Sequence, residues 1–271
     1  MNAHTGNMPQ TGNVPHTGTV FEARQISIRF GGIRAVDNVS FDVRAGEVFC
    51  IIGPNGAGKT TIFNLISRIY PPTEGKLMFM GQDITEIPPH KIAGLGIART
   101  FQNIELFANA SVLQNLLIGR HCHAKTDLFS QLCFLPNARR AEIAHREKVE
   151  DVIEFLELQR YRDTLIANLP YGVRKIVELG RALCTEPKLL LLDEPSSGLN
   201  VEETEVMGFW IDDIKKDLGI TVIMVEHDMS LVSAVADRVL ALNYGKVLAT
   251  GTAAQVQADP EVIRAYIGGE A

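Results

Sequence analysis

The sequence has no long apolar run and no recognisable export signal. No stretch approaches the roughly 18 consecutive apolar residues that a membrane-spanning helix needs. The N-terminus lacks the charged and then apolar segment of a secretory signal peptide. We therefore expect a chain that does not cross a membrane and stays in the cytoplasm.

Basic residues are not in excess either. The 26 Lys and Arg residues stand against 32 Asp and Glu residues, which gives a net charge of -6, and no basic stripe appears along the chain. The sequence therefore does not predict a bulk electrostatic partnership with nucleic acid or attachment to a membrane surface by charge.

Cysteine is scarce. The chain contains Cys50, Cys122, Cys133 and Cys184. Their spacing shows no pairs, so we expect reduced thiols. His121 and His123 beside Cys122 are metal-binding residue types, but with Cys133 they match no recognised metal-site spacing. Adjacent helical residues point in different directions, which favours a solvated helix end.

What is present supports a sizeable core. The chain has 271 residues, of which 46% are hydrophobic, enough for one large domain or two small ones. The first 20 residues are an exception, with the near-repeat HTGNMP, QTGNVP and HTGTV. Such a segment has almost nothing to bury, so we predict a disordered tail over residues 1–20.

Short apolar runs alternate with helical patterns on both sides of a central segment. We predict strands at 25–30, 40–43, 48–52, 189–192, 221–225 and 239–242, and a hairpin over 76–84. Alternating runs of this length are typical of a buried parallel sheet with helices on both faces. Between residues 110 and 183 the strand signal gives way to helical periodicity, with a capping box at Ser111 and Gln114. The sequence predicts an α/β fold with a helical insertion.

Residues 53–61 read GPNGAGKTT, and they lie between a predicted strand and a predicted helix. Glycines in this loop allow the backbone amides to curl around a phosphate chain, while Lys59 supplies a charge and Thr60 a hydroxyl for Mg²⁺. The positive end of the helix faces the same anion. A simple glycine turn is the alternative, and the strand–loop–helix context disfavours it. The expected nucleotide contacts are Gly53, Pro54, Asn55, Gly56, Ala57, Gly58, Lys59, Thr60 and Thr61.

A second cluster follows the predicted strand 189–192. Asp193 is placed to hold Mg²⁺, and Glu194 to polarise a water that attacks the terminal phosphate. An acidic pair after an apolar run is otherwise a simple turn. The phosphate loop in the same chain favours the catalytic interpretation.

Further motifs follow in a fixed order, and with them the chain resembles the ATP-binding-cassette (ABC) ATPases from about residue 21 to 268. Gln102 in RTFQN matches the glutamine loop of that family, and SGLN at 197–200 matches the loop after the catalytic carboxylate. His227 in VEHDM matches the switch histidine, and Phe30 falls where the family stacks an aromatic ring on adenine.

The resemblance implies a P-loop NTPase fold with ATP and Mg²⁺ as cofactors. A mainly parallel core sheet and an antiparallel β subdomain would occupy residues 21–100 and 186–268, with an α-helical subdomain at 101–185. Gln102 would contact Mg²⁺ and the membrane partner, and His227 the terminal phosphate. Phe30 would stack on the base, although a core position is the alternative.

The signature sequence departs from the common form Leu-Ser-Gly-Gly-Gln. Leu169, Pro170, Tyr171, Gly172 and Val173 stand in those places. Pro170 offers neither the serine hydroxyl nor an amide, but it suits the first turn of a helix, so the amides that follow can bind phosphate. In the family the signature faces the phosphate loop of another subunit. We therefore expect Leu169, Tyr171 and Gly172 to act in trans.

Local stretches such as RFGGIRAVDNVSFDV, ARTFQNIELF and DPEVIRAYIG resemble the G-type ATPases of branched-chain amino-acid importers. The resemblance implies permease subunits, a second and shorter ATPase chain or an identical copy, and indirectly a periplasmic solute-binding protein. The chain would then lie at the cytoplasmic face of the inner membrane. Urea or amide import, lipopolysaccharide export and a soluble ABC ATPase outside transport remain open. A small-molecule kinase has no reason to carry the ordered set of motifs.

Overall fold

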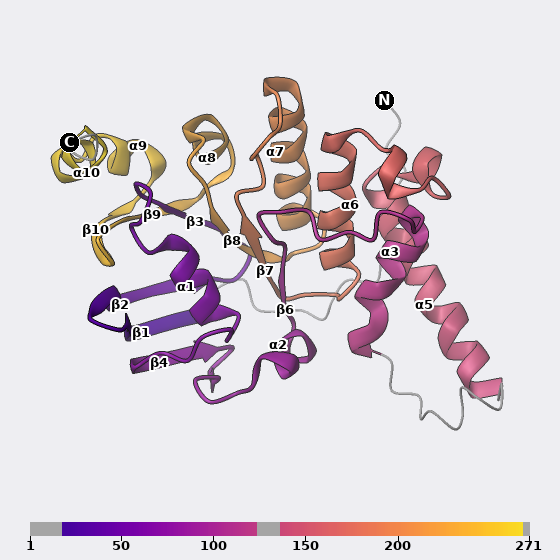
Figure 1. The fold of residues 1–271 in the computed structure, drawn as a ribbon, viewed down its shortest axis with the longest axis horizontal. Coiled ribbons are helices and arrows are strands. Elements are labelled where there is room, and N and C mark those ends of the chain that lie inside the picture. The colour runs from indigo at the N-terminus through magenta and orange to yellow at the C-terminus, as the bar shows by residue number, and fades with distance from the viewer. Residues whose placement is uncertain (1–17, 124–135, 268–271) are drawn as a thin grey trace. The chain divides into compact units, whose positions relative to one another are not determined.

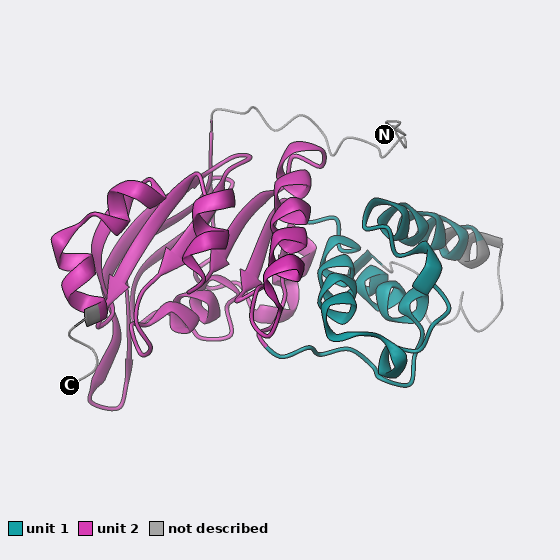
Figure 2. Cartoon of the chain, turned by 90° about the horizontal axis from the view of Figure 1, so that it is seen from above, with its two compact units in different colours: residues 1–11, 103–187 teal, residues 12–102, 188–271 magenta. Residues whose placement is uncertain are grey.

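The computed structural model describes residues 18–123 and 136–267, apart from the side chains of residues 136–139, 141 and 267. The described residues form two compact units (Figure 2). One comprises residues 103–187, and the other comprises the segments up to residue 102 and from residue 188 onward. The helical subdomain predicted at 101–185 therefore differs by two residues at each end. Residues 1–17 and Gly268 lie outside the described part of the chain.

A six-stranded sheet forms the centre of the larger unit (Figure 1), in the order β10-β9-β3-β8-β7-β6. Its strands are β3 (Val48–Ile52), β6 (Ile97–Arg99), β7 (Leu189–Asp193), β8 (Thr221–Val225), β9 (Arg238–Asn243) and β10 (Lys246–Gly251). All neighbouring strands pair in parallel except β10, which is antiparallel to β9. The predicted parallel core sheet is thus confirmed, although β6 and β10 were not predicted.

Helices cover both faces of this sheet. In β7, Leu189 and Leu191 belong to one core cluster with Ile62 of α1. Leu190 and Leu192 are equally buried but lie outside that cluster, because successive side chains of a strand point to opposite faces. The helices of this unit are α1 (Lys59–Ile66), α2 (Pro89–Leu95), α7 (Val201–Lys216), α8 (Met229–Val235), α9 (Ala253–Gln257) and α10 (Pro260–Ile267). Helix α7 contacts both β8 and α8. Helices α7 and α8 therefore cover the second face of the sheet.

A four-stranded antiparallel sheet in the order β2-β1-β4-β5 completes this unit. Its strands are β1 (Thr19–Phe30), β2 (Ile33–Arg44), β4 (Glu74–Phe79) and β5 (Gln82–Asp83). The predicted strands 25–30 and 40–43 were too short. In β1 the register shifts between Ala23 and Ile26, and Gln25 has φ 50, so the apolar alternation is broken there. The tail boundary at residue 20 was also wrong, because β1 begins at Thr19 and Val20 is buried.

The smaller unit is helical. It contains α3 (Val112–Gly119), α5 (Pro136–Phe155), α6 (Tyr171–Leu183) and the 3-10 turns η1 (Arg120–His123), η2 (Gln159–Tyr161) and η3 (Ile166–Asn168). The predicted capping box is present, since the Ser111 hydroxyl accepts the Gln114 amide and the Gln114 side chain accepts the Ser111 amide. Helices α3 and α6 approach closely at Gly119, where a Cβ would lie 2.3 Å from the carbonyl oxygen of Arg181.

The three cysteines in the described residues, Cys50, Cys122 and Cys184, are free thiols, as predicted. Cys133 lies outside the described residues. His123 Nε2 lies 2.8 Å from the carbonyl oxygen of Thr185, so this ring contacts backbone in the helical unit.

The buried face of β7 gives a first prediction. Replacing Leu191, which is fully buried, with Ala removes core contacts and should lower the free energy of unfolding by about 2–5 kcal/mol. Replacing Val201, which is 77% exposed, with Ala should change it by less than about 0.5 kcal/mol. Urea denaturation followed by the fluorescence of Trp210 measures both. Equal losses in the two variants would contradict the packing described.

Candidate active site

The loop between β3 and α1 requires glycine at two of its positions. Gly53 has φ +152, and a Cβ there would lie 2.3 Å from the carbonyl oxygen of Leu242. Gly58 has φ +103, and a Cβ there would lie 2.6 Å from the carbonyl oxygen of Ala35. Any larger residue would displace the backbone. The adjacent backbone at Leu242 and Ala35 thus fixes the loop in a curled conformation.

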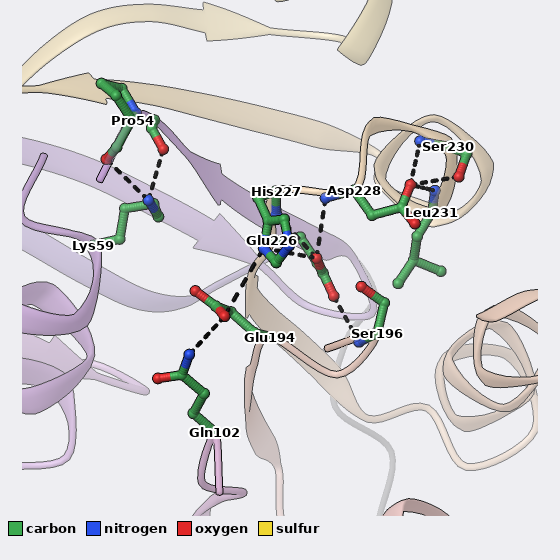
Figure 3. A network of polar contacts seen from close by, with 11 residues as sticks. Pro54, Lys59, Gln102, Glu194, Ser196, Glu226, His227, Asp228, Ser230 and Leu231 are labelled. Atoms are coloured by element: carbon green, nitrogen blue, oxygen red, sulfur yellow. Dashed lines mark hydrogen bonds and ion pairs between the residues drawn. The ribbon is translucent and has the colours of Figure 1, made fainter. Parts of the chain in front are cut away.

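Lys59 is buried under this loop at the start of α1. Its Nζ donates to the carbonyl oxygens of Gly53 at 2.6 Å and Pro54 at 3.1 Å. Figure 3 shows the contact between Lys59 and Pro54. Burial lowers the pKa of the Lys59 ammonium, while the carboxylates of Glu194 and Asp193 act in the opposite direction. A positive charge beneath a glycine loop at a helix N-terminus is a site for an anion.

The remaining residues of the loop differ in exposure, and Thr61 is half-buried. Ala57 is buried and its amide donates to the carbonyl oxygen of Pro54 at 3.1 Å. Asn55, Gly56 and Thr60 are exposed. These residues are therefore accessible to a ligand.

Asp193, at the end of β7, is held by an arginine that the sequence analysis did not single out. Arg99 at the end of β6 donates to Asp193 Oδ2 at 2.7 Å, and the two side chains are 9% and 5% exposed. The same guanidinium donates to Asn64 at 2.7 Å and lies over the rings of Phe63 and Phe101. Arg99 thereby connects β6 and β7 to α1.

The three side chains predicted to be catalytic lie together (Figure 3). Gln102 Nε2 donates to Glu194 Oε2 at 2.8 Å. His227 Nδ1 lies 3.9 Å from the same carboxylate oxygen. Glu194 itself has φ 48, an uncommon conformation for a residue with a Cβ. Gln102 and His227 are exposed, so both can reach a ligand.

The residues predicted to hold Mg²⁺ have suitable donor atoms. Thr60 offers a hydroxyl, Gln102 an amide oxygen and Asp193 a carboxylate, and hard oxygen ligands are those that Mg²⁺ prefers. Because Arg99 binds Oδ2 of Asp193, the orientation of that carboxylate is already fixed. The residues fit this cation by chemistry.

Phe30 lies at the end of β1 with 44% of its surface exposed. Its ring meets that of Tyr70 edge-on, with the ring centroids 5.1 Å apart and an interplanar angle of 72°. The alternative that Phe30 belongs to the core is therefore wrong. An exposed aromatic face is available for stacking on a planar ligand.

The signature residues lie in the helical unit. Pro170 is the N-cap of α6, with φ -55 and ψ 152, and the helix begins at Tyr171, so the prediction of Pro170 in the first turn was wrong by one residue. Leu169 and Gly172 are buried, while Tyr171 is 45% exposed. Arg174 Nε donates to the carbonyl oxygen of Leu169 at 2.8 Å, which fixes the backbone ahead of the helix.

Glu226 is a second polar residue that the sequence analysis missed. It follows β8 directly and is fully buried. Its carboxylate accepts the backbone amides of Ser196 at 2.8 Å, His227 at 2.9 Å and Asp228 at 3.2 Å. The available signal was a glutamate directly after the apolar run 222–225, because such a position continues a buried strand.

The phosphate-binding loop, the paired carboxylates and the six-stranded sheet define a P-loop nucleotide-binding protein. The family model of the ABC transporter matches residues 36–197. A model described as the branched-chain amino acid ATP-binding cassette transporter matches residues 246–271. The chain belongs to the ABC transporter family and is an ATP-binding-cassette ATPase. The predicted fold class is confirmed.

Individual relatives agree with this assignment. The high-affinity branched-chain amino acid transport ATP-binding protein LivG of Escherichia coli K12 is 39% identical over 90% of this chain and 95% of its own length. BraF of Pseudomonas aeruginosa PAO1, described in the same words, is 38% identical over 92% of this chain and 98% of its own.

A solved structure is similar over nearly the whole chain. The ADP conformation of MJ1267, an ATP-binding cassette of an ABC transporter, has a TM-score of 0.82 and 33% identity, and the match covers 93% of this chain and 100% of that one. In the described residues, no helix is long and apolar enough to cross a membrane.

The buried pair of Arg99 and Asp193 gives a second prediction. Replacing Arg99 with Met leaves a buried carboxylate without its cation and should lower the free energy of unfolding by about 3–5 kcal/mol. As a control, replacing Lys216, whose partner Asp212 lies with it at the surface, should cost less than about 1 kcal/mol. Denaturant titration of both variants measures the two changes in the free energy of unfolding. A loss of less than 1 kcal/mol for Arg99→Met would refute the importance of the pair.

Proposed function

We propose that this chain is the ATP-hydrolysing subunit of an importer of branched-chain amino acids. LivG and BraF carry that transport function in their names, and the match of residues 246–271 to the branched-chain amino acid cassette model supports the same substrate class. Urea or amide import and lipopolysaccharide export are the competing functions.

One observation supports hydrolysis most strongly: Gln102 and His227 both approach Oε2 of Glu194. In our proposal Glu194 polarises the attacking water, His227 donates to the terminal phosphate, and Gln102 orients the carboxylate. Lys59 and the amides of the loop bind the phosphate chain. Phe30 stacks on the adenine ring.

Mg²⁺ is the second proposed cofactor. When bound, it supplies positive charge to the phosphate oxygens of ATP. Thr60, Gln102 and Asp193 are the residues that would hold it. Arg99 keeps the Asp193 carboxylate in one orientation through its hydrogen bond at 2.7 Å.

The site is completed by a second cassette in this proposal. Leu169, Tyr171 and Gly172 act in trans, and the amides of Tyr171 and Gly172 in the first turn of α6 bind the anion. Since ATP binds the closed pair, it shifts the population toward that pair. The second cassette is a shorter chain or an identical copy. Permease subunits hold both at the cytoplasmic face of the inner membrane, and a periplasmic solute-binding protein delivers the amino acid.

The role of Glu194 is tested by Glu194→Gln. The amide no longer polarises water, so phosphate release should fall at least about 100-fold while ATP binding persists. Turnover is measured by phosphate release, ATP binding by equilibrium dialysis, and the closed pair by size-exclusion chromatography in ATP.

Glu202→Gln is the matched control, because Glu202 is exposed in the first turn of α7. It should keep the wild-type rate. Undiminished phosphate release in Glu194→Gln would rule out Glu194 as the residue that polarises the attacking water.

The substrate class is tested by uptake in cells that lack this chain. Uptake of radiolabelled leucine, isoleucine and valine should fall and should recover with the wild-type chain but not with Glu194→Gln. Urea uptake and lipopolysaccharide export serve as controls and should not change. Normal leucine uptake, or a defect in either control process, would contradict branched-chain amino-acid import.

A further inference from the structure

Glu226 connects two loops that carry proposed catalytic residues. One carboxylate oxygen, Oε1, accepts the amide of Ser196 at 2.8 Å, and Ser196 is two residues beyond Glu194. The other oxygen, Oε2, accepts the amides of His227 at 2.9 Å and Asp228 at 3.2 Å. Figure 3 shows Glu226 between these two loops. A single side chain therefore hydrogen-bonds to the backbone of both loops.

The buried Glu226 carboxylate is satisfied by three backbone amides. Glu226 is fully buried, and a buried carboxylate is costly unless hydrogen bonds satisfy it. An apolar side chain after β8 would avoid that cost, but it would accept none of the three amides. The Glu226 carboxylate is also one of two that approach the imidazole, since His227 Nδ1 lies 3.9 Å from Oε2 and 3.9 Å from Oε2 of Glu194.

Further contacts fix the position of Glu226 itself. Its amide donates to the carbonyl oxygen of Ile51 in β3 at 3.3 Å. The amide of Glu194 donates to the carbonyl oxygen of Val225 at 3.0 Å. The backbone of Glu226 is thus hydrogen-bonded to β3, the strand that precedes the phosphate loop. The backbone of Glu194 is hydrogen-bonded to Val225, the residue before Glu226.

We propose that Glu226 is a positioning residue that holds His227 against Glu194 by hydrogen bonding to both loops. The proposal rests on the proposed hydrolytic roles of His227 and Glu194. Glu226 touches no reacting atom. Its effect passes through the backbone of His227, so its loss should change kcat and leave the KM for ATP unaltered.

Glu226→Gln tests this directly. A carboxamide has one acceptor oxygen, so it can accept the Ser196 amide or those of His227 and Asp228, and its NH2 group then opposes the other loop. We expect kcat per bound ATP to fall about 10- to 100-fold, since small displacements of catalytic groups have effects of this size. The KM for ATP should stay within about twofold, because the phosphate loop keeps its contacts.

Glu47→Gln is the matched control. Glu47 is also buried in this unit and accepts hydrogen bonds from the Arg44 amide and from Arg238, but it precedes β3 at the end away from the phosphate loop. It should lower the melting temperature without changing kcat per bound ATP. If Glu226→Gln fails to fold, Glu226→Asp replaces it, since the shorter carboxylate cannot span both loops. Equal kcat in the Glu226 and Glu47 variants would overturn the proposal.

A double-mutant cycle with His227→Ala separates positioning from general damage. If Glu226 acts through His227, adding Glu226→Gln to His227→Ala should change kcat by less than about twofold. Losses that multiply would overturn the proposal. Unchanged turnover in both His227→Ala and Glu194→Gln would instead overturn the proposed function itself. If His227→Ala and Glu194→Gln each lower kcat as expected, but the losses from Glu226→Gln and His227→Ala multiply in the double mutant, only the role of Glu226 would be overturned.

Discussion

The parallel pairing of β3, β8 and β7 is the constraint on which the site depends. Ile51 pairs with Val225, and Val225 pairs with Asp193, so three strands end at nearly the same level. Ligands of open α/β sheets bind at the carboxyl ends of the strands. The phosphate loop, the carboxylate pair and the His227 loop each follow directly from one of these ends. Their proximity is therefore set by strand register.

Three buried charged residues lie at this edge. Lys59, Asp193 and Glu226 are all less than a tenth exposed, and each would be costly in a core without partners. Lys59 donates to backbone carbonyls, Asp193 accepts from Arg99, and Glu226 accepts three amides. The contacts that offset burial also fix the position of each group. This fixed polar environment is what transition-state stabilisation by an enzyme requires.

The sequence predicted the elements whose signal is local. The strands at 48–52 and 221–225 agree with the structure to the residue, because four or five consecutive buried apolar residues leave little ambiguity. Short or exposed elements carried no such signal. The strand β6 has three residues, and all six residues of β10 are partly or fully exposed. The break in β1 at Gln25 likewise concealed half of that strand.

The candidate site divides in the same way. The phosphate loop and the carboxylate pair are contiguous motifs and can be read directly. The partnership of Arg99 with Asp193 joins residues 94 positions apart, and only the pairing of β6 with β7 brings them together. Glu226 was visible as a charge after an apolar run, but its three amide donors come from two loops that the sequence alone does not relate.

We propose that this sheet edge forms an ATP-hydrolysing site that a second cassette completes. The most direct measurement is phosphate release from ATP and Mg²⁺ by the purified chain over a wide range of chain concentrations. We expect hydrolysis whose rate per chain rises with the concentration of the chain until pairing is complete. No phosphate release at any concentration, or a rate per chain that does not depend on concentration, would contradict it.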